Sequence, residues 1–118
     1  MLFRSDICTK TGVIPDAFFS AHAHNYQRYT RHFGGKQVPY FVVGTGGMPP
    51  QKVPTATGQP TDSGHQTTYD AAVASLGYLF VTMSATQLKT EFWPLGSQSA
   101  DPFDPISVDL ATHTVNSR

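Results

Sequence analysis

The fold is decided by one stretch, residues 78–93, which reads YLFVTMSATQLKTEFW. Its first half is rich in aromatic and β-branched residues, which favour strands. In its second half Leu88 and Phe92 alternate with Lys89 and Glu91. This alternation is typical of a strand with one buried and one solvated face. Because only a short link joins the two halves, the stretch predicts a β-hairpin near the edge of a sheet.

Three further strands are expected, two before this hairpin in the sequence and one after it. Residues 17–19 are apolar on both faces, which predicts a central strand buried on both sides. Residues 37–43 follow the turn signal of residues 34–36 and alternate as a strand does. Residues 106–110 alternate in the same way and predict a last short strand.

Helix is expected in two places only. Residues 2–11 have a loose helical spacing of apolar residues, and Gly12 is a suitable stop. One helical turn is expected over residues 69–75. Residues 48–67 are rich in Pro, Gly and Thr without an apolar period, which predicts a long surface loop that exposes His65. The chain is therefore expected to be one α/β, β-rich domain spanning residues 1–118.

Composition excludes several classes of function. The 118 residues carry a formal net charge of zero, and only 14% of them are charged. This balance gives no basic footprint for nucleic acid. The chain also has no apolar run near the roughly 20 residues that a membrane-spanning helix needs. The single cysteine, Cys8, cannot form a disulfide within the chain.

Residues 20–28, SAHAHNYQR, contain the candidate chemistry. In an extended backbone, residues two apart point to the same side, so His22 and His24 can aim two imidazoles into one cavity. Neutral imidazole is a common ligand of zinc, iron and manganese. The alternative is that the two histidines lie close together by chance in a polar loop. Asn25 can contact a ligand or hold its own turn, and Arg28 can contact phosphate or pair with a structural carboxylate.

Two segments, residues 14–29 and 40–47, resemble the C-terminal part of the calcineurin-like metallophosphoesterases, in particular the purple acid phosphatase-like branch. That family has a Gly-His-X-His motif after a core strand and a Gly-X-Gly-Gly segment after a later strand. Here Ala21 stands in the place of the first glycine, and residues 44–47 read GTGG. The resemblance implies a partial αββα sandwich made of central strands, the metal-ligand loop and a terminal β-hairpin. It also implies a close backbone approach of the glycine segment to that loop.

The resemblance further implies a phosphoester hydrolase with a dinuclear centre of iron, zinc or manganese. His22 and His24 would each bind one metal ion. Asn25 and Arg28 are the residues whose chemistry could contact the phosphate ester substrate. The family's Asp-X-His, Gly-Asp and Gly-Asn-His-Glu segments do not occur in this sequence. We therefore expect residues 1–118 to be a C-terminal fragment that is inactive alone and whose partner is the missing N-terminal half. The alternative is a non-catalytic, β-rich interaction module with a degenerate metal motif.

Overall fold

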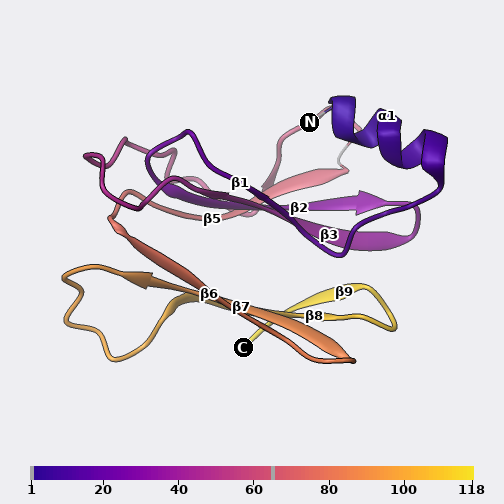
Figure 1. Ribbon diagram of the computed structural model, residues 1–118. Helices are drawn as coiled ribbons and strands as arrows, with labels where there is room; N and C mark the ends of the chain where they lie inside the picture. The colour runs from indigo at the N-terminus through magenta and orange to yellow at the C-terminus, as the bar shows by residue number, and fades with distance from the viewer. Residues whose placement is uncertain (1, 65) are drawn as a thin grey trace.

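Two β-sheets packed face to face form the protein in a computed structural model that describes residues 2–64 and 66–118 (Figure 1). The first sheet has five strands in the order β1-β3-β2-β5-β4. Its strands are β1 (Phe18–Ser20), β2 (Tyr26–Phe33), β3 (Lys36–Val43), β4 (Gln59–Pro60) and β5 (Thr67–Val73). β1 runs parallel to β3, and the other pairings of this sheet are antiparallel.

The second sheet is an antiparallel meander of four strands in chain order. Its strands are β6 (Gly77–Met83), β7 (Gln87–Pro94), β8 (Phe103–Asp109) and β9 (Thr114–Ser117). The one helix of the described residues, α1 (Leu2–Thr11), lies on the side of the first sheet that faces away from the second (Figure 1). The β-rich character expected from the sequence is confirmed, with two mostly antiparallel sheets and little helix.

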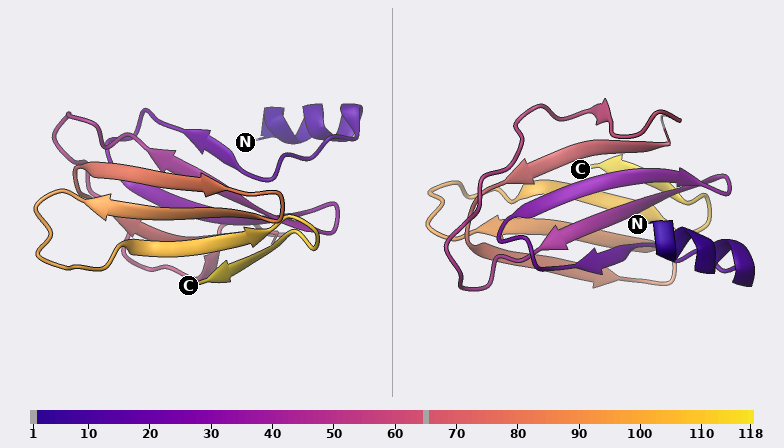
Figure 2. Two further views of the ribbon diagram at one scale, coloured as in Figure 1. Left: turned by 60° about the horizontal axis from the view of Figure 1, so that its bottom comes forward. Right: turned by 90° about the horizontal axis from the view of Figure 1, so that it is seen from above.

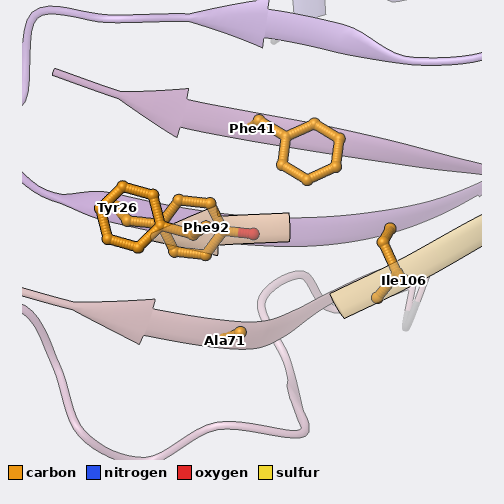
Figure 3. Close-up of a cluster of buried hydrophobic side chains, with 5 residues drawn as sticks. All are labelled: Tyr26, Phe41, Ala71, Phe92 and Ile106. Atoms are coloured by element: carbon orange, nitrogen blue, oxygen red, sulfur yellow. The ribbon is translucent and has the colours of Figure 1, made fainter. Parts of the chain in front are cut away.

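The core lies between the two sheets and is built from a few large side chains (Figure 3). Tyr26, Phe41 and Ala71 project from the first sheet and meet Phe92 and Ile106 of the second. The rings of Tyr26 and Phe92 stack with centroids 4.7 Å apart. Burying each large apolar side chain stabilises the fold by about 1.5–3 kcal/mol, so this cluster holds the sheets together.

Several predicted elements are confirmed. β6 and β7 pair as an uninterrupted hairpin, and Leu88 and Phe92 are buried as the alternation requires. Gly34 and Gly35, with φ of 59° and 78°, form the turn between β2 and β3. Two consecutive positive φ angles are typical of the type I′ hairpin turn, which explains the two glycines. α1 ends at Thr11, directly before Gly12, whose φ is 70° and whose N–H donates a hydrogen bond to the carbonyl of Cys8.

Other predictions were wrong. Residues 69–75 form no helical turn, because most of them belong to β5, which pairs with both β2 and β4. Residues 17–19 do not form a central strand buried on both sides. β1 is an edge strand here, and the Phe19 side chain is 48% exposed. Residues 26–33 form β2 and residues 114–117 form β9, two strands that the sequence did not predict. The expected exposure of His65 lies outside the described residues.

Candidate metal-ligand loop

Two loops leave the first sheet at the same end. β1 and β3 run in parallel, with Phe18 opposite Tyr40 and Ser20 opposite Val42. Residues 21–25, here called the histidine loop, follow β1, and residues 44–47, the glycine loop, follow β3. The carboxyl ends of neighbouring parallel strands are a preferred place for ligand sites in sheets. The register therefore places both candidate segments at one corner of the sandwich.

The glycine loop touches the backbone of the histidine loop. A Cβ atom on Gly44 would lie 2.0 Å from the carbonyl oxygen of Ala23, so only glycine fits there without displacement of the chain. The Gly44 N–H donates a hydrogen bond of 3.2 Å to the carbonyl of Asn25. The close backbone approach expected beside the histidine loop is thus confirmed.

Gln51, in the long loop after β3, also holds the backbone of the histidine loop through hydrogen bonds. Its side-chain Oε1 accepts a hydrogen bond of 2.9 Å from the His24 N–H, and its own N–H donates one of 2.8 Å to the His24 carbonyl. A further bond of 2.9 Å from the Asn25 N–H to the Ala23 carbonyl closes a tight turn centred on His24. The backbone around His24 is therefore held by three separate hydrogen bonds.

The two imidazoles themselves are available to a ligand. His22 is exposed and His24 is partly buried. Within residues 2–64 and 66–118 neither ring takes part in a hydrogen bond or an ion pair. The extended backbone expected for residues 22–24 was wrong, because His22 has a φ of 84° and a turn is centred on His24. This left-handed conformation costs a non-glycine residue about 1–3 kcal/mol. Such strain is found most often where a side chain must be held in a particular direction for function.

The donor set fits part of a metal centre. Two imidazoles without competing partners are suitable ligands for zinc, manganese or iron. However, the described residues contain no group of three or more His, Cys, Asp or Glu side chains that could hold a metal ion. A firmly bound ion needs about four ligands, of which a catalytic site takes three from protein. The histidine loop can therefore supply only a fraction of a centre.

Arg28 lies inside the sandwich in a network of charged groups. Its Nε and Nη2 donate to both oxygens of Asp104 at 2.7 and 2.9 Å, and its Nη1 donates to Asp70 at 3.0 Å. Burial opposes the charge of the guanidinium, but the hydrogen bonds and charge of Asp104, aided by Asp70, raise its pKa overall. Burial and the Asp104 carboxylate likewise raise the pKa of Tyr26, whose hydroxyl donates to Asp104 at 2.7 Å.

The structure favours the structural alternative for both candidate substrate residues. The guanidinium of Arg28 is bound by two carboxylates of the chain, as a structural arginine would be. The buried Asn25 side chain accepts a hydrogen bond from Gln27 at 2.8 Å and donates one to the Gln51 carbonyl at 3.3 Å. Contact of Arg28 or Asn25 with a phosphate ester stays a prediction.

The sequence did not reveal three residues that shape this region. Gln51 lies in a stretch without periodicity, so nothing local marks it as the partner of His24. Asp70 lies in the segment for which a helical turn was expected, and no local pattern marks Asp104 as a partner of Arg28. The available signal was Arg28 itself, since a cation at an inward position of a strand requires buried carboxylates.

Comparisons with known proteins add no relative. No family model, curated protein or solved structure matches the chain. Among the described residues no helix is long and apolar enough to cross a membrane.

Proposed function

We propose that the histidine loop donates His22 and His24 to the dinuclear metal centre of a phosphoester hydrolase. In this proposal each imidazole binds one ion of iron, zinc or manganese. The remaining ligands come from polypeptide beyond the described residues. The metal pair, when bound, would supply positive charge for phosphoryl oxygens and lower the pKa of a bound water.

The single observation that supports the proposal is that the backbone of the histidine loop is fixed while the imidazole rings of His22 and His24 make no hydrogen bonds to the described residues. Gly44 and Gln51 hold the backbone of the loop, while the rings of His22 and His24 have no hydrogen-bonding partner in the described chain. His24 is partly buried, and polar groups away from water usually have a hydrogen-bonding partner in the chain. The fixed backbone limits where the two imidazoles can lie, which favours binding of a metal ion.

The chain's own residues would contribute to the chemistry by holding His22 and His24 in position. The exposed ring of His22 and the partly buried ring of His24 would be held by the clamped backbone rather than by side-chain bonds. The network around Arg28 would keep β2, and with it the end of the loop, against the second sheet. None of the eight acidic residues occurs in the family's carboxylate segments, so we expect no phosphatase turnover from this chain alone.

Paramagnetic line broadening by Mn²⁺ tests the ligand assignment. Ring signals of His22 and His24 are expected to broaden at lower Mn²⁺ concentration than those of His32, an exposed histidine on β2 that serves as the matched control. The double variant His22→Ala, His24→Ala should show no preferential site. Equal broadening at all three rings would overturn the assignment.

An aryl phosphatase assay with added manganese, iron or zinc tests where the other ligands reside. The purified chain should hydrolyse the ester no faster than the double variant does. Turnover above that control would mean that this chain holds a complete active site, which contradicts the proposal.

A specific observation also favours the alternative of a β-rich interaction module. Large apolar side chains are exposed along β6, among them Tyr78, Phe80 and Met83 with exposed fractions of 60%, 54% and 66%. Such patches on soluble proteins mark surfaces that bind other polypeptides. Edge variants that change association but leave Mn²⁺ binding unaltered would separate this role from the metal role.

A further inference from the structure

The two sides of the sandwich end in different kinds of edge. Seen from above in the right view of Figure 2, β1 and β6 lie on one side and β4 and β9 on the other. β4 has only two residues, one of them Pro60, and the four residues of β9 are followed by Arg118. Short length, proline and charge are the usual means of protecting a free edge against pairing.

β6 has none of these protections. Its seven residues, GYLFVTM, include no charge and no proline, and all seven pair with β7 in continuous register. Its other edge carries no strand in the described part of the chain. At the start of β6 this edge is occupied by Thr45, whose carbonyl accepts a hydrogen bond of 3.2 Å from the Gly77 N–H and whose hydroxyl donates one of 2.9 Å to the Gly77 carbonyl. A long, regular and uncharged edge of this kind is a template for a further strand.

The interior of the sandwich is also uncovered along β6. Val81 and Met83 stand opposite Thr90 and Leu88 of β7, so all four point to the inner face of the sheet. Thr90 and Leu88 are buried at 0% and 2%, yet Val81 and Met83 are 42% and 66% exposed. Leu79 near the start of β6 is partly buried against the core, so the core reaches β6 at that end and leaves Val81 and Met83 uncovered.

The first sheet is open on the same side. Phe19 of β1 stacks on the buried Phe41 with ring centroids 5.1 Å apart, but its own side chain is half exposed. A groove of about 610 Å³ runs between the two sheets here, with Phe19, Leu79 and Val81 among its lining. The described residues that line it carry no formal charge. The groove matches an apolar, neutral partner.

We propose that a second copy of this chain covers this side, with β6 pairing antiparallel to β6 of the second copy about a two-fold axis at Phe80. In an antiparallel pair, directly opposite residues point to the same face. A two-fold axis at Phe80 sets Leu79 opposite Val81 and Tyr78 opposite Thr82, so inner residues meet inner residues and outer ones meet outer ones. An axis placed between two residues would mix the faces. Centring on Phe80 pairs residues 78–82 of the strand and leaves Gly77, which bonds to Thr45 of its own chain, outside the ladder.

Exposed apolar side chains supply a large part of the area that such a dimer needs. The side chains of Phe19, Tyr78, Phe80, Val81 and Met83 are between 42% and 66% exposed. Since a large aromatic side chain buries about 150–250 Å², these five supply roughly 500 Å² per copy before the backbone ladder is added. A standard interface buries about 800 Å² per partner. The contact is isologous, so it closes at two copies.

The dimer does not depend on the proposed metal chemistry. Ala21 of the histidine loop and Gly77 at the start of β6 line the same groove. The two-fold axis sets Gly77 opposite Met83, which puts the two histidine loops at opposite ends of the paired strands. A second copy therefore neither completes the metal centre nor consumes His22 and His24.

Sedimentation equilibrium of charge variants at the axis tests the dimer. Phe80→Lys and Phe80→Glu each place two like charges directly opposite one another, so each alone should dissociate at least about tenfold more readily than the wild type. An equimolar mixture of the two variants should recover the dimer, because the charges then attract. Phe80 is 54% exposed, so both variants should fold, which far-UV circular dichroism checks. Asn116→Lys on the exposed part of β9 is the matched control and should remain dimeric.

Three results would overturn the proposal. A wild-type chain that is monomeric at about 100 µM would mean that the edge serves another polypeptide or stays solvated. A mixture of the two variants that remains monomeric would exclude the axis at Phe80. Open-ended growth beyond two copies would exclude a closed two-fold contact.

Discussion

Replacing Arg28 with methionine removes the one cation from a buried cluster of charges. The side chain of Arg28 is 8% exposed, and its partners Asp104 and Asp70 are 10% and 20% exposed. Removing one member of a buried ion pair typically costs about 3–5 kcal/mol, because the remaining charge has no partner. Here two carboxylates lose their shared cation. We therefore expect Arg28→Met to lower the free energy of unfolding by about 3–5 kcal/mol, out of the about 5–15 kcal/mol that a domain has.

Urea unfolding measures this loss directly. It is done at low protein concentration so that association does not stabilise the folded state. Lys89→Met on the solvated face of β7 is the control and should stay within about 0.5 kcal/mol of the wild type. Adding Asp104→Asn to Arg28→Met should recover part of the loss, since it removes one of the stranded charges.

A small effect would refute this reasoning. If Arg28→Met stays within about 1 kcal/mol of the wild type, as an exposed ion pair would, the guanidinium is not required for folding. Contact with a phosphate ester would then become the better explanation of an arginine at this position.

Three further predictions concern the loops. Gly44→Ala should lower the free energy of unfolding by about 1–3 kcal/mol and shift the NMR signal of the His24 amide, because the new Cβ collides with the Ala23 carbonyl oxygen. Gly46→Ala is the control and should not shift that signal, because the space around Gly46 is open. Gln51→Ala should speed hydrogen exchange at the His24 amide by roughly tenfold, because the acceptor of that amide is lost. Hydrogen bonds from backbone N–H groups of the β8–β9 turn lower the pKa of Asp109. The ionised carboxylate therefore stabilises the turn fully above its unfolded pKa of about 3.9. This stabilisation is lost as the pH falls through the lower pKa of the folded state. Turn amide shifts should titrate there, and Asp109→Asn should abolish the titration.

The strands that the sequence predicted are those whose pattern is set by local physics. β6 is rich in strand-forming residues, β7 alternates between apolar and polar residues, and the β2–β3 turn needs two glycines at positive φ. These features could be predicted from neighbouring residues. β5 could not, because its residues fit a helix as well as a strand locally. Pairing with β2 on one side and β4 on the other decides its conformation. The exposed position of β1 was missed because an apolar run does not show whether both faces are covered.

The candidate site could be predicted only in part for a similar reason. Adjacent residues mark His22 and His24, and the need for glycine at position 44 follows from a resemblance that includes both loops. The fixed backbone depends on Gln51, which is 27 residues from His24 in the chain. The role of Arg28 depends on Asp104, which is 76 residues away. Long-range partners of this kind leave no periodic signal in the sequence.

The two open sides of the core differ in polarity, and this difference explains why only one of them would be covered. On the side of β5 and β9, the inner surface is polar: Arg28, Thr30, Thr68 and Asp70 line an open cavity of about 370 Å³ together with Ser117. Such groups are compatible with water, so that side needs no cover. On the side of β1 and β6 the inner surface is apolar and uncharged, and contact with water there is unfavourable.

The side of β1 and β6 is therefore the one that a partner would cover. That side is also the one at which the histidine loop begins, because Ala21 borders the apolar groove. A second copy and a polypeptide that carries further metal ligands would both approach along this groove. The two would compete for β6, so a dimer that forms in the purified chain should weaken when such a polypeptide is present.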